Sequence, residues 1–340
     1  MSQILTYEQI DRAAWGQLVR ESETGTWFQS PEAYAFYASL PDVMEPFVYG
    51  LINDRSPMTN GQLQLRALCV GYVTSERNPL KQFFTRRAII NGGVCLADDA
   101  TNEEVETLLV HLRNHMGAKA IYLETRNFND YSRWKVAFEN AGFVYKPHLD
   151  FHVRTDGFEA RLSDNRKRQI KKAESTKEKV ERYRSQSERD VQEWYGVLSE
   201  LYRTKVKTPL FPIVFFLEAY RQGVGKFLLV RYAGKIIGGS MVVADDKCVY
   251  EWFECGLNTR YKDQYPSVIA TVSGIEFARR QGCARYDMMG AGEPDVPYGV
   301  RDFKAEFGGQ LVEYGRFLCV CKPCLYRLGA FVVRLLKRGA

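Results

Sequence analysis

The stretch that decides the fold is residues 267–288, SVIATVSGIEFARRQGCARYDM, which reads as an amphipathic helix, a glycine and then a strand. Residues 103–124, EEVETLLVHLRNHMGAKAIYLE, follow the same order. A glycine directly after a helical pattern is typical of a helix end. The two glycines concerned, Gly117 and Gly282, lie 165 positions apart. This spacing predicts an internal repeat.

Two further landmarks repeat at nearly the same offset. Residues 138–143, FENAGF, match residues 304–309, KAEFGG, at an offset of 166. Residues 68–73 match residues 236–241, where Gly71 and Gly238 are 167 positions apart. In the second pair a glycine interrupts each predicted strand, which indicates a bulge or the close approach of another segment. Each copy then runs through helices, a meander of strands, and helix, strand, helix, strand. This order predicts an α/β fold with a mixed sheet, of the kind found in GNAT acyltransferases, in two tandem copies.

The predicted domain boundaries follow from turns and from a change of composition. A polar turn at residues 154–157 follows a predicted strand over 144–153, so we expect a first GNAT-like domain over 1–154 and a second over 155–317. Residues 318–340 read as a basic amphipathic helix that packs back on the first domain. Contact of this helix with an anionic membrane surface is the equally weighted alternative.

Composition favours a packed intracellular protein. The chain has 340 residues, 45% hydrophobic, and a net charge of +6. Neither an export signal nor an apolar stretch long enough to span a membrane is recognised, so we expect a cytoplasmic protein, with peripheral contact at the inner face of the plasma membrane as an option. The eight cysteines are scattered and read as reduced thiols. The cluster Cys319, Cys321 and Cys324 lacks a second CxxC, so no metal is predicted.

The loops that a CoA-dependent enzyme needs are not recognisable. Residues 279–284, RRQGCA, fit the pyrophosphate-binding pattern, but they lie at a helix C-terminus, where the dipole disfavours phosphate. The loop before the helix, residues 259–266, contains no glycine. We therefore predict that the acyl donor is not a CoA thioester and that no cofactor is used.

A basic run is the second informative stretch. Ser163 or Asp164 can cap a helix over the following residues, which would carry a dense cation surface. The candidate tRNA or phosphate ligands are Arg166, Lys167, Arg168, Lys171 and Lys172. A solvated basic helix is the alternative, with about half the weight.

The third stretch is residues 297–309. Phe303 and Phe307 are four apart and can bury on one side of a helix, leaving Lys304 to point into a cleft, where its ammonium would stabilise an oxyanion. Taken alone, an ordinary surface lysine is favoured by about three to one.

Together these stretches resemble the FemAB family of peptidoglycan interpeptide-bridge aminoacyltransferases. The resemblance rests on Trp27-Phe28-Gln29-Ser30-Pro31, on residues 166–174 and on residues 303–309, and covers nearly the whole chain, without the coiled-coil arm of some members. It implies transfer of an amino acid from aminoacyl-tRNA to the amine of lipid II or a UDP-MurNAc-peptide in cell-wall synthesis, without metal or CoA. It also implies that Lys304 assists the transferring carbonyl.

Further site residues follow from the same resemblance. Tyr250 and Trp252, on a strand, would line the cleft, and Arg203, Lys205 and Lys207 would hold precursor phosphates. Tyr298, Arg301 and Phe303, in the segment around Lys304, are the remaining candidates for substrate binding.

Two other functions stay open. One is an N-acyltransferase that takes a different activated acyl group, in polysaccharide or lipid modification. The other is a noncatalytic RNA-binding module that uses the basic helix, for which strongly salt-dependent RNA binding without turnover would be diagnostic. No Ser-His-Asp elbow is present, and His111 and His115 share a helix face without an HExxH motif.

Overall fold

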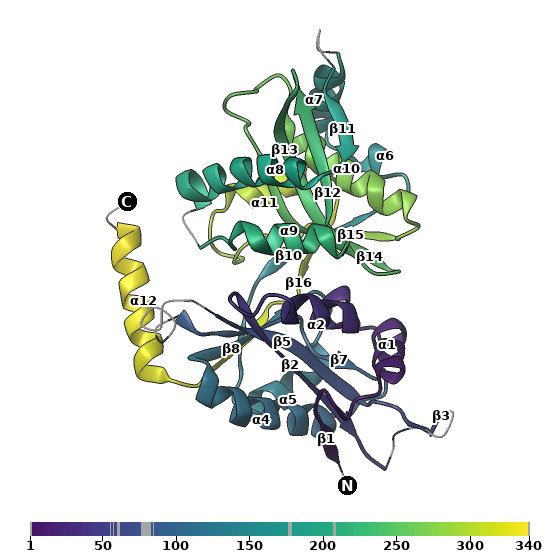
Figure 1. Ribbon diagram of the computed structural model, residues 1–340, viewed down its shortest axis with the longest axis vertical. Helices are drawn as coiled ribbons and strands as arrows, with labels where there is room; N and C mark the ends of the chain where they lie inside the picture. Colours follow the sequence, from purple (N-terminus) through teal and green to yellow (C-terminus); the bar gives the residue numbers. More distant parts are fainter. Residues whose placement is uncertain are drawn as a thin grey trace. The chain divides into compact units, whose positions relative to one another are not determined.

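The computed structural model describes residues 2–338 except 55, 57, 60, 61, 76–82, 84, 176–178, 207 and 208. Within the final helix, the side chains of residue 330 and of residues 332–338 are also not described. The chain divides into two compact units (Figure 1). Unit 1 comprises Met1–Pro147 and Tyr314–Ala340, and unit 2 comprises His148–Glu313.

Unit 1 is a mixed sheet between two layers of helices. In spatial order its strands are β1 (Gln3–Leu5), β2 (Met44–Ile52), β5 (Ala67–Thr74), β6 (Ala88–Gly92), β8 (Tyr122–Asn127), β17 (Arg316–Val320) and β9 (Val144–Lys146), with β7 (Cys95–Leu96) paired to β5. Neighbours are antiparallel except β6 and β8, which are parallel. Helices α4 (Asn102–Lys119) and α5 (Lys135–Asn140) pack on the main core, and α1 (Arg12–Glu21) and α2 (Pro31–Ala38) lie on the other side of the sheet (Figure 1).

Unit 2 repeats this architecture. Its strands are ordered β11 (Glu181–Arg184), β12 (Lys226–Tyr232), β13 (Lys235–Ala244), β14 (Cys248–Gly256), β15 (Arg285–Asp287), β10 (Leu149–Arg154) and β16 (Gln310–Glu313). Again one neighbouring pair, β14 and β15, is parallel. Helices α10 (Pro266–Arg280) and α7 (Asp164–Glu174) contact each other, with α10 on the sheet. Helices α8 (Glu188–Leu201) and α9 (Ile213–Arg221) also pack together, with α8 against β13 and β14.

The two sheets match strand for strand, so the predicted tandem GNAT-like fold is confirmed. Helix α10 equals the predicted helix within one residue, and α4 is longer than predicted at its C-terminal end. The predicted close approach at the strand glycines is also confirmed. A Cβ atom at Gly71 would lie 2.5 Å from the Ile89 carbonyl oxygen, and one at Gly238 would lie 2.8 Å from that of Cys255.

The units exchange one strand, and this changes the expected boundaries. The predicted strand over 144–153 is two strands in different sheets, β9 in unit 1 and β10 in unit 2. Conversely β17, expected at the end of the second domain, pairs with β8 and β9 in unit 1. The structure therefore divides the chain after Pro147 and after Glu313, in place of the expected 1–154 and 155–317. The turn at residues 154–157 follows β10 within unit 2.

The C-terminal helix α12 (Pro323–Arg338) belongs to unit 1. The Tyr326 ring lies 5.5 Å from that of Tyr122, and Lys322 Nζ donates to the Ala118 carbonyl at 3.0 Å. Further along, Leu328 is 49% and Phe331 59% exposed. In the part of the chain that the structure describes, no helix is both long and apolar enough to cross a bilayer.

Candidate active site in unit 2

The parallel strands of unit 2 pair only briefly. Residues 248–250 of β14 pair with residues 285–287 of β15, after which β15 ends while β14 continues to Gly256. A β-bulge follows at once, because Met241 and Val242 of β13 face Phe253 and Glu251, leaving Trp252 as the extra residue. Bulges often redirect side chains beside active sites. The second half of β14 therefore lacks β15 as a neighbour on that side.

Lys304 lies in helix α11 (Gly299–Ala305) and is buried, with 8% exposure. Its Nζ donates to the carbonyls of Met288, Met289 (2.9 Å) and Gly290 (2.7 Å), in the segment that leaves β15. A surface lysine is thereby excluded. An ammonium has three N–H donors, and all three are used here, so binding an oxyanion requires the exchange of at least one of these carbonyls.

The segment that holds Lys304 is itself fixed by two aspartates. Met289 and Gly290 have left-handed φ angles of 51° and 77°. The Met289 N–H donates to Asp287 Oδ1 at 2.8 Å, and the Gly290 N–H donates to Asp150 Oδ1 at 2.9 Å. Asp150 and Asp287 thus orient the carbonyls that bind the ammonium.

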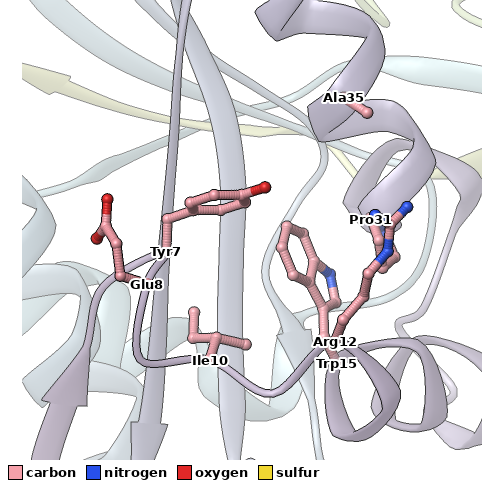
Figure 2. A pocket seen from close by; sticks show the side chains of 7 residues that line it. All are labelled: Tyr7, Glu8, Ile10, Arg12, Trp15, Pro31 and Ala35. Atoms are coloured by element: carbon pink, nitrogen blue, oxygen red, sulfur yellow. The ribbon is translucent and has the colours of Figure 1, made fainter.

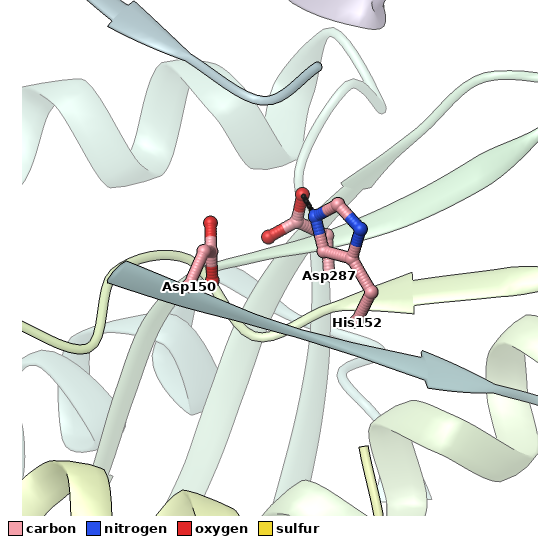
Figure 3. A group of neighbouring side chains, drawn as sticks. All are labelled: Asp150, His152 and Asp287. Atoms are coloured by element: carbon pink, nitrogen blue, oxygen red, sulfur yellow. Dashed lines mark ion pairs between the residues drawn. The ribbon is translucent and has the colours of Figure 1, made fainter. Parts of the chain in front are cut away.

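Asp150, His152 and Asp287 form a buried cluster on β10 and β15 (Figure 3). His152 Nε2 lies 3.2 Å from Asp287 Oδ2. Burial and the neighbouring Asp287 raise the pKa of Asp150 well above its usual range. Burial alone would raise the pKa of Asp287, but His152 and Arg285 lower it.

These three residues could also be metal ligands by type and spacing, since one ligand atom from each lies within 4.8 Å of the others. Each carboxylate, however, already accepts backbone N–H groups, and Asp150 also lies in the field of the Lys304 ammonium. The backbone N–H groups and the Lys304 ammonium thus already do for these carboxylates what a bound metal ion would do, which is to bind their oxygens and offset their negative charge.

Two acids that the sequence analysis did not identify lie beyond the separation of β14 and β15. Glu251 Oε1 accepts hydrogen bonds from the hydroxyl groups of Ser240 (3.2 Å) and Thr271 (3.4 Å). Glu254 Oε1 is buried and has no hydrogen-bond partner among the described residues. Burial and the nearby Glu251 raise the pKa of Glu254 to about 8. The available signal was two glutamates within an otherwise apolar strand, which is unusual for a buried segment.

The basic helix divides into buried and exposed cations. Arg166 is only 5% exposed and lies over the rings of Phe303 (4.4 Å) and Phe307 (4.9 Å), while donating to the Phe303 carbonyl at 3.1 Å. The expectation that Arg166 binds phosphate is therefore not met, since it joins α7 to α11. Lys167 donates to the Ala160 carbonyl and Lys172 pairs with Asp263 at 2.8 Å. Arg168 and Lys171 are exposed.

Most other predicted site residues have structural contacts. Tyr250 is fully buried and donates to Asp245 at 3.1 Å, so it does not line an open cleft as expected. Half-buried Trp252 packs its ring 5.2 Å from that of Phe215. Arg301 donates to the carbonyls of residues 291, 293, 294 and 296, which holds the loop before α11 rather than a substrate.

The remaining candidates lie near the ends of elements. Phe303 is half-buried beneath Arg166, and Tyr298 is 43% exposed. Arg203 and Lys205 are exposed on a π-helical turn, Tyr202–Val206, that continues α8. Lys207 lies outside the described residues. The structure thus places Lys304 among the acids of unit 2. Of the predicted cations, Lys167 and Lys172 are exposed but bonded to protein groups, and the others that are exposed are Arg168, Lys171, Arg203 and Lys205.

The N-terminus of α10 is where a phosphate would be expected to bind in this topology. The Ser267 N–H donates to Asn258 Oδ1 at 3.2 Å, and Asn258 Nδ2 donates back to Ser267 Oγ at 2.7 Å. Asn258 thus takes a backbone donor that a pyrophosphate would need.

Unit 1 has a cavity of about 280 Å³ that is lined by residues between Tyr7 and Ala35, none of them among the predicted site residues. Figure 2 shows the Tyr7 and Trp15 rings on opposite sides of it. Tyr7 stacks on Tyr34 at 4.5 Å, and Trp15 Nε1 donates to the Gln29 carbonyl at 2.6 Å. Its aromatic walls are therefore fixed by contacts within unit 1.

Comparison with known proteins agrees with this architecture. Residues 160–304 match the family model described as an acetyltransferase (GNAT) domain. No curated protein matches the sequence. The chain is similar in structure to FemX, with a TM-score of 0.69 and 12% identity over 96% of this chain and 99% of that one.

Two other solved structures share the fold. The tandem GNAT protein from the clavulanic acid biosynthesis pathway has a TM-score of 0.58 and 9% identity, covering 94% of this chain and 99% of that one. The C-terminal domain of a putative lysylphosphatidylglycerol synthetase from Agrobacterium fabrum has a TM-score of 0.56 and 12% identity, covering 95% of each. The class that the fold defines is therefore the tandem GNAT-like proteins. Of these three structures, FemX has the highest TM-score.

Proposed function

We propose that this protein is an acyltransferase that moves an amino acid from aminoacyl-tRNA to the amine of a peptidoglycan precursor, either lipid II or a nucleotide-linked muropeptide. The observation that carries the proposal is the buried ammonium of Lys304. It lies where β14 and β15 separate, in the segment that resembles the FemAB family.

The proposed role of Lys304 is electrostatic. An aminoacyl ester is already activated, so the protein has to align the amine with the carbonyl and stabilise the negative charge that develops on the carbonyl oxygen. A fixed ammonium in a buried site does this without reorganisation of solvent. In the free protein the three backbone carbonyls occupy its donors, and the developing oxyanion, a stronger acceptor, replaces one of them.

The exposed cations of unit 2 supply the surface for anionic substrates. We assign Arg168 and Lys171 to the tRNA backbone, and Arg203 and Lys205 to precursor phosphates, because these side chains are exposed. Helix α12, with exposed Leu328 and Phe331, is the part suited to peripheral contact with the inner membrane surface, which would bring a cytoplasmic enzyme to lipid II.

The test is incubation with mixed charged tRNA and with lipid-linked or nucleotide-linked muropeptide, followed by mass spectrometry of the acceptor. The acceptor should gain the mass of an amino-acid residue. Lys304→Met should reduce the rate by roughly 100-fold or more, the scale for loss of one oxyanion donor. Lys235→Met, at an exposed position on β13, is the matched control and should keep its activity. Full activity of a folded Lys304→Met protein would remove the catalytic assignment.

A second candidate function is N-acyl transfer from another activated donor to a lipid or polysaccharide amine. The match of residues 160–304 to an acetyltransferase domain favours it. The Asn258 cap on α10 argues against CoA as that donor. Acyl transfer from an activated donor other than a CoA thioester, with no transfer from charged tRNA, would decide for it.

A further inference from the structure

We infer that Glu254 is a catalytic base for this reaction, and that the acceptor reaches the site as a primary ammonium whose proton Glu254 removes. This inference rests on the proposed function, since it assigns the amine side of the same transfer. Lys304 stabilises the charge that develops on the carbonyl oxygen, and Glu254 removes a proton from the attacking amine.

The position of Glu254 is the first reason. It lies on β14 beyond Tyr250, the last residue that pairs with β15, and beyond the bulge at Trp252. The pairing with β15 has ended there, so this part of β14 has no β15 backbone beside it, and the proposed role requires the acceptor to approach from this side. Lys304 is close enough for its charge to act on Glu254.

The second reason is the contrast with Glu251, its neighbour on the same strand. Glu251 Oε1 accepts two hydroxyls, from Ser240 and Thr271. Glu254 Oε1 is buried without any partner in the described part of the chain. A buried oxygen without a hydrogen bond is costly and rare in native proteins. An incoming N–H donor would satisfy it.

The third reason is the charge around the two glutamates. The groups that act on Glu254 are Glu251, Ser267 of α10 and Lys304 of α11, and Glu254 in turn affects Tyr286 of β15 and the adjacent Cys255. Because burial and Glu251 raise the pKa of Glu254 to about 8, roughly a tenth of the molecules carry the Glu254 carboxylate at pH 7, and this ionised form is the base. An arriving ammonium favours the carboxylate form, as a nearby positive charge does.

The chemistry balances without a further reactant. The acceptor ammonium gives one proton to the Glu254 carboxylate, and the free amine attacks the ester carbonyl to form the C–N bond. The oxyanion is held by Lys304. The C–O bond to the ribose then breaks, the leaving oxygen takes the second amine proton, and Glu254 releases the first proton to water.

The test compares two acceptors with the full-length protein at pH 7. One is the muropeptide, whose primary amine is protonated at this pH, and the other is hydroxylamine, which is already unprotonated. Glu254→Gln should slow transfer to the muropeptide by roughly 100-fold to 10,000-fold, the range for general-base catalysis. Transfer to hydroxylamine should fall by only a few-fold. Glu251→Gln, the matched variant, should affect both acceptors equally.

Several results would overturn the assignment. Equal losses with both acceptors, or no loss with either, mean that Glu254 takes no proton from the acceptor. If Glu254→Gln does not fold, Glu254→Asp serves instead, since it keeps a base and should shift the pH profile of transfer to the muropeptide but not to hydroxylamine. An unshifted profile overturns the inference. Wild-type protein that uses neither acceptor overturns the proposed function, and this inference with it.

Discussion

Each unit has a glutamate beside its central strands, fully buried in unit 1 and half-buried in unit 2, and the two are in opposite states. In unit 1, Glu104 on α4 accepts from Arg66 (3.0 Å), Asn53 (2.7 Å) and the Thr101 N–H (2.7 Å). Burial would raise its pKa, yet these bonds lower the pKa to about 2. In unit 2, Glu254 has a buried oxygen without a partner and a pKa raised to about 8. A paired buried charge stabilises a fold, whereas an unpaired one indicates a site.

The same contrast appears at one position of the repeat. At the offset of 166, Phe138 of α5 corresponds to Lys304 of α11. Phe138 is fully buried and stacks on Phe317 at 3.9 Å. Lys304 is buried among carbonyls and acids instead. Duplication has therefore kept the backbone while one copy became an apolar scaffold and the other acquired polar groups suited to chemistry.

The largest effect is expected from removing the partner of Glu104. Arg66→Met leaves this buried carboxylate without its cation, and should lower the free energy of unfolding by about 3–5 kcal/mol. Urea unfolding followed by tryptophan fluorescence would measure it. Arg12→Met, which breaks the exposed pair with Glu32 (3.6 Å), is the control and should cost under about 1 kcal/mol. Similar small losses in both variants would show that the Glu104 network is not structural.

A smaller effect, of opposite sign, is expected for Glu254. Its folded pKa lies above that of the unfolded chain, so the folded state holds the extra proton between about pH 4.3 and pH 8 and loses stability as the pH rises through this range. Glu254→Gln cannot ionise. Relative to wild type, it should gain about 2 kcal/mol between pH 5 and pH 9, less than the full linkage value because the side chain is half-buried. Urea unfolding at both pH values measures this, and a pH-independent difference would contradict it.

The contribution of Glu104 to the free energy of unfolding should change with pH in the opposite direction to that of Glu254, so the two residues can be compared within one protein. Its folded pKa is depressed, so its contribution is present above about pH 4.5 and is lost as the pH falls towards 2. Glu104 therefore contributes to the acid arm of the stability curve and Glu254 to the alkaline arm.

The fold was more predictable from sequence than the site. Gly282 follows α10 with a left-handed φ of 78°, as expected, whereas Gly117 lies inside α4, so its expected place at a helix end was wrong. The duplication was recognised from the constant spacing of the landmarks. The strand exchange was missed, since β10 and β17 are five or six residues long and their partners lie far away in the sequence. The predicted strand over 144–153 is interrupted by Lys146, Pro147 and His148, and it is there that the chain passes from β9 in one sheet to β10 in the other.

The site was only partly predictable because residue type does not report burial. Lys304 was singled out through its flanking phenylalanines; its burial excludes an ordinary surface lysine, and its catalytic role stays a prediction. Glu251 and Glu254 were missed because the apolar residues around them were read only as a strand, and sequence does not show which carboxyl groups of a strand are withdrawn from water. Arg166 was misassigned because a run of cations does not reveal which one turns inward onto Phe303 and Phe307.

The smallest effect on stability extends the comparison to the cations of α7, where Arg166 is buried and Arg168 and Lys171 are exposed. The double variant Arg168→Ala/Lys171→Ala should change the free energy of unfolding by no more than about 0.5 kcal/mol, because it alters only exposed side chains. It should nevertheless make the dependence of log affinity for tRNA on log salt concentration shallower by about 1–2. Each phosphate contact that is lost leaves roughly one more counterion bound to the tRNA, so that fewer counterions are released on binding. Fluorescence anisotropy across a salt series measures this slope. Arg166→Ala should have the opposite pair of effects. It should lower the free energy of unfolding, because the contacts between α7 and α11 are lost, and it should leave the salt dependence of tRNA binding unchanged. An unchanged slope in the double variant would mean that tRNA is held elsewhere on the protein.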